Sequence, residues 1–122
     1  MDLSAKHVPT IRNDLFGGKG AVKLWSLLRS SAEPFTAVLA CVLDPGGHVG
    51  GHSQRSFPEI VIGLAGTGVV TINGIKQPLG TGDCVYLPLG GVMEIKNYSD
   101  SEGLHYLIIK ARNSESFAPS KA

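Results

Sequence analysis

Residues 46–59 read GGHVGGHSQRSFPE, a polar and glycine-rich stretch between two apolar runs. In an extended strand, side chains two residues apart share a face, so His48, His52 and Gln54 are predicted to line one side. A row of imidazole and amide groups separated by glycines is unusual for a solvent-facing strand and for a plain core. The pattern favours a pocket wall with room for a ligand or an ion, and Glu59 would return a carboxylate to the same pocket.

Short apolar runs along the rest of the chain predict a β protein. Each run is closed by Gly, Pro, Asn or Asp, at intervals typical of a sandwich or barrel. No segment has a 3.6-residue apolar period over ten residues, and Asn73-Gly74 is a strong hairpin turn signal. We expect strands over residues 21–28, 35–43, 59–65, 69–72, 75–79, 84–87, 92–96 and 104–111.

Length and composition restrict the class of protein. The chain has 122 residues, of which 43% are hydrophobic, and a formal net charge of +1 at pH 7. These values predict one folded domain and argue against disorder and against a strongly basic nucleic-acid binder. The glycine-rich segments 17–20 and 63–68 lack the spacing or the following helix of a nucleotide-binding loop, so no nucleotide cofactor is expected.

The sequence shows no targeting or membrane signal. The first residues lack the apolar core of a signal peptide, and no apolar run approaches the ~20 residues that span a bilayer. We therefore expect a cytoplasmic protein without a membrane partner. Cys41 and Cys84 each lie in an apolar run and are expected to be small buried residues in a reducing compartment, with a disulfide between them left open.

Eight positions at fixed spacing resemble the two motifs of the cupin family. The first motif, G-x5-H-x-H-x3–4-E-x6-G, is matched by Gly46, His52, Glu59 and Gly66. The second motif, G-x5-P-x-G-x2-H-x3-N, is matched by Gly82, Pro88, Gly90 and Asn97. The chain resembles a small single-domain cupin of the cupin-2 type. This resemblance implies an antiparallel jelly-roll β-barrel over residues 1–112, with an N-terminal strand segment, and a polar, flexible tail over residues 113–122.

The same resemblance implies a degenerate metal centre. Cupins commonly use three His and one Glu, but this chain has Gln54 and Met93 where two of those His would stand. An amide oxygen binds weakly, and a thioether suits only soft ions. Alternation over residues 92–96 nevertheless places Met93 on the inside. Two alternatives remain open: a divalent metal (Fe, Mn, Ni, Cu or Zn) held by His52, Gln54 and Glu59, or a metal-free barrel.

Three further side chains are candidates for the pocket beside Met93. His48 is the best substitute ligand, although about 13 Å of extended strand separates it from His52 unless Gly50-Gly51 bends the chain. His105 lies in the last predicted strand, with its facing undetermined. Tyr86 would supply a donor to an oxyanion.

These residues lead to two main functional hypotheses. The first is a small-molecule-binding cupin with a degenerate metal centre. It would either only bind an oxygenated metabolite or, with Glu59 as general acid or base, carry out isomerase or lyase chemistry on it. The alternative is a metal-dependent cupin enzyme, such as a dioxygenase, that uses His52 and Glu59. A non-catalytic sensing module is less well supported, and whether the protein is an enzyme stays open. The expected partners are a small-molecule ligand and a second copy of the chain, paired through an exposed strand around residues 8–11.

Overall fold

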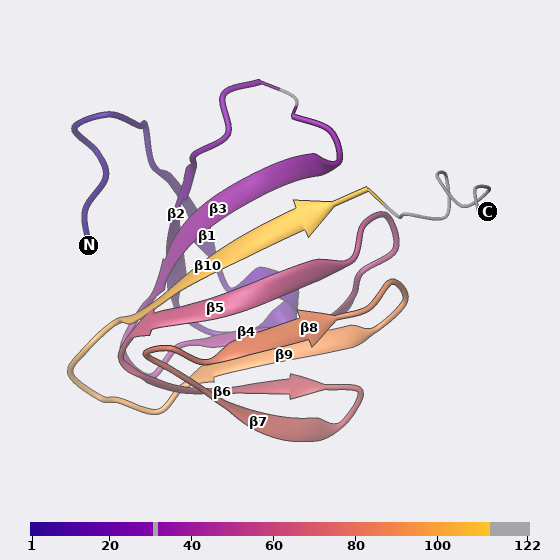
Figure 1. The fold of residues 1–122 in the computed structure, drawn as a ribbon. Helices are drawn as coiled ribbons and strands as arrows, with labels where there is room; N and C mark the ends of the chain where they lie inside the picture. The colour runs from indigo at the N-terminus through magenta and orange to yellow at the C-terminus, as the bar shows by residue number, and fades with distance from the viewer. Residues whose placement is uncertain (31, 113–122) are drawn as a thin grey trace.

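The computed structural model describes residues 1–30 and 32–112, whose strands form two antiparallel sheets (Figure 1). The six-stranded sheet has the order β1 (Thr10–Asn13), β2 (Ala21–Ser26), β3 (Phe35–Leu43), β10 (Leu104–Ala111), β5 (Glu59–Ala65) and β8 (Cys84–Leu87). The four-stranded sheet has the order β4 (His48–Ser53), β9 (Val92–Asn97), β6 (Thr67–Ile72) and β7 (Ile75–Gly80). A single turn of 3-10 helix, η1 (Leu15–Gly17), precedes β2.

The two sheets pack face to face around an apolar core. In Figure 1, β3, β10 and β5 lie across the upper part of the view, with β9, β6 and β7 across the lower part. Alternating side chains of each strand point into the space between the sheets, and the most buried include Leu43, Val61, Val70, Leu87 and Ile95. This arrangement confirms the predicted all-β jelly roll, because non-local antiparallel pairing buries one face of every sheet.

Most of the predicted strands are present with small differences at their ends. The predictions for residues 35–43, 59–65, 84–87 and 104–111 agree residue for residue with β3, β5, β8 and β10. The Asn73-Gly74 turn joins β6 to β7, and both residues have positive φ, as a two-residue hairpin turn requires. The predicted tail, residues 113–122, lies outside the described residues. In the part of the chain that the structure describes, no helix is long and apolar enough to cross a membrane.

A β-bulge in β4 changes which of its side chains face inward. Val49 pairs with Ile95 and His52 pairs with Met93, so three steps along β4 match two steps along β9. The extra residue lies at Gly50-Gly51 and reverses the alternation. Val49 and His52 therefore both line the interior, while His48 points away from it. The prediction that His48 and His52 share a face is wrong for this reason.

Close backbone contact holds η1 against the bulge. A methyl group on Gly50 would overlap the carbonyl oxygen of Phe16, and one on Gly18 would overlap the carbonyl oxygen of His48. Only glycine permits these approaches at both positions. Lys19 and His48 also exchange backbone hydrogen bonds of 2.7 and 2.8 Å. The segment that carries Phe16 is thereby fixed beside His52.

Candidate functional site

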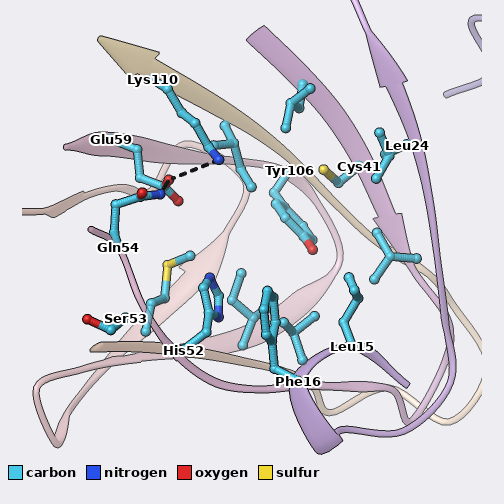
Figure 2. Close-up of a pocket in the computed structure, with 16 residues that line it drawn as sticks. Leu15, Phe16, Leu24, Cys41, His52, Ser53, Gln54, Glu59, Tyr106 and Lys110 are labelled. Carbon is cyan, nitrogen blue, oxygen red and sulfur yellow. Dashed lines mark hydrogen bonds and ion pairs between the residues drawn. The ribbon is translucent and has the colours of Figure 1, made fainter. Parts of the chain in front are cut away.

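A cavity of about 290 Å³ lies between the two sheets, beside η1. Its lining is divided by polarity, as Figure 2 shows. Lys110, Glu59 and Gln54 gather at one end, and Leu15, Leu24 and Cys41 lie at the other. An apolar pocket with a few converging polar groups is the usual form of a small-molecule site. The volume is at the small end of the range for such sites.

Glu59 is the carboxylate that lines the cavity, and 3% of its surface is exposed. Its Oε2 accepts a hydrogen bond of 2.7 Å from Gln54 Nε2 and lies 3.9 Å from Lys110 Nζ. Lys110 is also its cross-strand neighbour on β10. The ammonium and the amide offset the cost of burying the carboxylate. Glu59 Oε1 has no hydrogen-bond partner among the described residues, so this oxygen is available to a ligand.

The hydrogen bonds of Gln54 fix the orientation of its amide. Its Oε1 accepts from the backbone N–H groups of Ser56 and Phe57, at 3.3 and 3.4 Å. Those groups can only donate, and an ionised Glu59 can only accept, so the amide NH₂ is the end that faces Glu59. Gln54 therefore presents a donor to this carboxylate and keeps its oxygen against its own backbone.

Two contacts hold the ring of His52. Its Nδ1 lies 3.2 Å from the carbonyl oxygen of Gly50, which can only accept a hydrogen bond. In the neutral ring, Nδ1 thus carries the proton and Nε2 keeps its lone pair. The ring of Phe16 stacks on the imidazole, with centroids 4.0 Å apart and an angle of 12° between the planes. His52 is a positioned acceptor on the wall of the cavity.

Cys41 and Tyr106 face the cavity as a cross-strand pair on β3 and β10. Burial raises the pKa of the Cys41 thiol to about 12, and the negative charge of Glu59 adds to the rise. Burial also raises the pKa of Tyr106 well above its usual value. Both groups are consequently neutral near pH 7, and the Tyr106 hydroxyl points into the cavity as a donor (Figure 2).

Of the additional pocket candidates, only Met93 lies in the cavity, where it is 1% exposed as predicted. His48 Nε2 lies 2.9 Å from Glu94 Oε2 on the outer face of the four-stranded sheet. Tyr86 is 60% exposed on the outside of β8. His105 lies between the inward-facing Leu104 and Tyr106, so it faces outward, and burial lowers its pKa. None of these three candidates lines this cavity, because strand register turns each side chain away from it.

Sequence reasoning missed Lys110, Tyr106 and Cys41 as cavity residues. Alternation along residues 104–111 places Tyr106 and Lys110 on one face, but it does not say which face is internal. Their relation to Glu59 and Cys41 depends on the pairing of β10 with β5 and β3. The cysteines also differ from the expectation in part. Both are free thiols, and Cys41 is buried, but Cys84 is exposed.

The donor set does not fit a catalytic metal site. His52 Nε2 and Glu59 Oε1 are the strong ligand atoms at the polar end of the cavity, and the Cys41 thiol lies at the opposite end. Catalytic metal sites take three protein ligands around one ion. The oxygen of Gln54 is engaged with the backbone, and the Lys110 ammonium next to Glu59 opposes a second cation. No group of three His, Cys, Asp or Glu side chains within residues 1–30 and 32–112 could hold a metal.

Comparison with known proteins agrees with the fold and the motif spacing. The family model described as a cupin domain matches residues 40–110. A dimethylsulfoniopropionate lyase of Ruegeria pomeroyi is 30% identical over an alignment of 109 residues, and the match covers 85% of this chain and 67% of the lyase.

Solved structures give the same result. The crystal structure of a predicted oxalate decarboxylase from Thermotoga maritima has a TM-score of 0.82 and 28% identity, covering 93% of this chain and 99% of that one. An RmlC-like cupin from Shewanella frigidimarina shares the fold, with a TM-score of 0.68, 17% identity and coverage of 97% and 95% of the two chains. With its family motifs, its two-sheet jelly roll and these relatives, the chain belongs to the cupin family.

Proposed function

We propose that the cavity binds a small oxygenated metabolite and that Glu59 exchanges a proton with it, in a reaction of the isomerase or lyase type. The observation that carries this proposal is the carboxylate itself. Glu59 is almost fully buried, one of its oxygens is held by Gln54 and Lys110, and the other has no partner among the described residues. A carboxylate fixed in this way is suited to general acid–base work.

The neighbouring groups fit the steps of such a reaction. Glu59 Oε1 would take a proton from a carbon next to a carbonyl group, and the C–H electron pair would move toward the carbonyl oxygen. The neutral Tyr106 hydroxyl would donate a hydrogen bond to the oxygen that gains charge. The proton would then return to another carbon, or a leaving group would depart with the electron pair. His52 Nε2 would accept a hydrogen bond from a substrate hydroxyl.

The comparisons support this reaction class without naming the substrate. One relative is a lyase and one structural neighbour is described as a predicted oxalate decarboxylase, so related barrels are associated with small oxygenated molecules. Cupins often bind divalent metals. A metal-dependent reaction such as dioxygenation would have to use His52 and Glu59, and no third strong ligand among the described residues lies beside them, since the Cys41 thiol is at the other end of the cavity. Proton chemistry requires only groups that are present.

The experiment compares Glu59→Gln with Glu94→Gln. Glu94 is a matched carboxylate on the outer face of β9, where it pairs with His48. A panel of small hydroxy acids, keto acids and sugars is incubated with each protein in D₂O. ¹H NMR then detects exchange of carbon-bound hydrogen, isomerisation or elimination. We expect turnover by the wild-type protein, a loss of about 100-fold or more in Glu59→Gln, and unchanged turnover in Glu94→Gln.

Retention of full activity by Glu59→Gln would show that this carboxylate does not handle the proton. Circular dichroism and thermal unfolding check that each variant is folded, because Gln keeps the shape of the side chain but loses the charge that Lys110 faces. A folded Glu59→Gln that binds a substrate without turning it over is the result that supports the proposal most directly.

A further inference from the structure

Lys110 brings a positive charge into the cavity without a direct hydrogen bond. Its side chain extends from β10 toward Glu59 and is 29% exposed. The distance of 3.9 Å from Nζ to Glu59 Oε2 is too long for a hydrogen bond. Within residues 1–30 and 32–112, no atom accepts a hydrogen bond from this ammonium. Its three N–H donors are therefore available to a ligand oxygen.

The rest of the lining restricts the shape of that ligand. The end of the cavity opposite Lys110 is formed by apolar side chains that include Leu15, Leu24 and Leu39 (Figure 2). A ligand that fills the cavity would place its polar group at Lys110 and a neutral part against these residues. The volume of about 290 Å³ leaves room for only a few carbons in that neutral part.

The charges of the cavity restrict the ligand further. Lys110 attracts an oxyanion, but the Glu59 carboxylate next to it repels one. A single negative charge delocalised over a carboxylate can contact the ammonium through one oxygen and keep the other away from Glu59. Lys110 is the one permanently charged cation among the described side chains that line the cavity, so a second negative charge on the ligand would have no partner. Glu59 would also repel it, and this repulsion is strong in a medium of low dielectric.

We infer that the cavity selects small monoanions, namely a carboxylate on a short neutral chain, and that Lys110 holds the carboxylate. This inference rests on the proposed function in one respect, that the cavity is the ligand site. It adds the ligand class and assigns a binding role to Lys110. In a barrel with a complete set of metal ligands, a bound metal would provide positive charge in the cavity. Here the Lys110 ammonium provides it.

The test measures binding of three probes: butyrate, the isosteric but neutral butyramide, and the dianion succinate. ¹⁵N-HSQC titrations at pH 7 and constant ionic strength give Kd for the wild-type protein and for three variants. Lys110→Met removes the charge but keeps the length of the stem, and Lys110→Arg keeps the charge. Lys96→Met is the matched control, because Lys96 lies over the Tyr98 ring on the outer face of the four-stranded sheet.

We expect the wild-type protein to bind butyrate about tenfold or more tightly than butyramide or succinate. Lys110→Met should lose the preference over butyramide, Lys110→Arg should keep most of it, and Lys96→Met should behave as wild type. The shifts should centre on residues of β5 and β10 at the cavity. The spectrum of each unliganded variant shows whether it is folded.

Three outcomes would overturn the inference: equal binding of butyrate by the wild type and Lys110→Met, a wild type that binds butyramide as tightly as butyrate, or no saturable shift from butyrate up to about 50 mM. Each leaves the proposed function testable by itself. If Glu59→Gln still abolishes turnover of some neutral substrate, the cavity is catalytic and only the ligand class is wrong. If turnover is insensitive to Glu59 while butyrate binding depends on Lys110, the proposed proton chemistry fails and the ligand class stands.

Discussion

The side chain at position 93 lies directly across the β4–β9 ladder from His52. Met93 is buried and lines the cavity, so it occupies a ligand position with a soft thioether. Gln54 also lies at the cavity, but its oxygen is held by the backbone of Ser56 and Phe57. With histidine at these two positions, the cavity would have a set of three imidazoles and one carboxylate.

The double substitution Met93→His with Gln54→His should create a metal site. It adds two imidazoles beside His52 and removes the hydrogen bond from Gln54 to Glu59 Oε2. We expect Zn²⁺ or Mn²⁺ affinity to rise by about 100-fold or more over wild type, measured by competition with a chromogenic chelator. Adding His52→Ala to the double variant should cancel the gain.

A wild-type protein that binds metal as tightly as the double variant would contradict the ligand count. In that case residues other than His52 and Glu59 supply the missing ligands. Elemental analysis of protein purified without chelator, alongside His52→Ala, gives the stoichiometry that decides this point.

At the scale of elements, the bulge in β4 and the turn η1 form one unit. Gly50 lies in backbone contact with Phe16, whose φ of 54° is rare for a bulky residue. This conformation places the Phe16 ring on His52. The bulge also sends His48 outward to Glu94. A local insertion of one residue therefore decides which histidine reaches the cavity.

Gly50→Ala should destabilise the fold and detach Phe16 from His52. The new methyl group would overlap the Phe16 carbonyl oxygen, and overpacking of this kind costs about 1–3 kcal/mol in the free energy of unfolding. Gly51→Ala is the matched control, because a methyl group there meets only Val92 Cγ1 at 3.7 Å, an ordinary contact. We expect its effect to stay within about 0.5 kcal/mol.

Urea unfolding of both variants measures the difference. Equal stability of Gly50→Ala and Gly51→Ala would mean that η1 moves away at little cost and does not fix the His52 ring. The expected loss at position 50 should be accompanied by changed chemical shifts of the His52 imidazole.

At the scale of the whole molecule, the outer side of the six-stranded sheet is partly covered by the chain itself. Trp25 is 1% exposed there, and its Nε1 donates a hydrogen bond of 3.3 Å to Ser4 Oγ. Other apolar side chains remain exposed, among them Tyr86 at 60%, Val8 at 88% and Ile11 at 58%. β1 is an edge strand of this sheet, and such an edge can pair with another chain.

We expect the protein to form a homodimer in which β1 pairs with the partner subunit, so that this edge of the sheet is covered. Light scattering coupled to size exclusion should give a mass near twice 12.8 kDa. Ile11→Lys should shift the mass to that of one chain. The control Ile75→Lys alters an isoleucine that is 66% exposed at the edge of the other sheet, and it should leave the mass unchanged. A clean monomer of the wild-type protein would remove the dimer from consideration.

The sequence by itself determined the strands, the hairpin and the family. Apolar alternation with a period of two and turn residues act over a few neighbours, so β3, β5, β8 and β10 are readable from local patterns. The same local alternation predicted that Met93 faces inward, and the motif spacing predicted that His52, Gln54 and Glu59 share one site. All four residues line the cavity.

Only the tertiary structure decided how the cavity is charged. Lys110 lies beside Glu59, and Tyr106 lies beside Cys41, because β10 pairs with β5 and β3, which are distant from it in the chain. The orientation of His48 depends on the fit of Gly18 and Gly50 between two backbones. Side-chain facing in a sheet depends on register, and one extra residue reverses it, so no local pattern could supply these contacts.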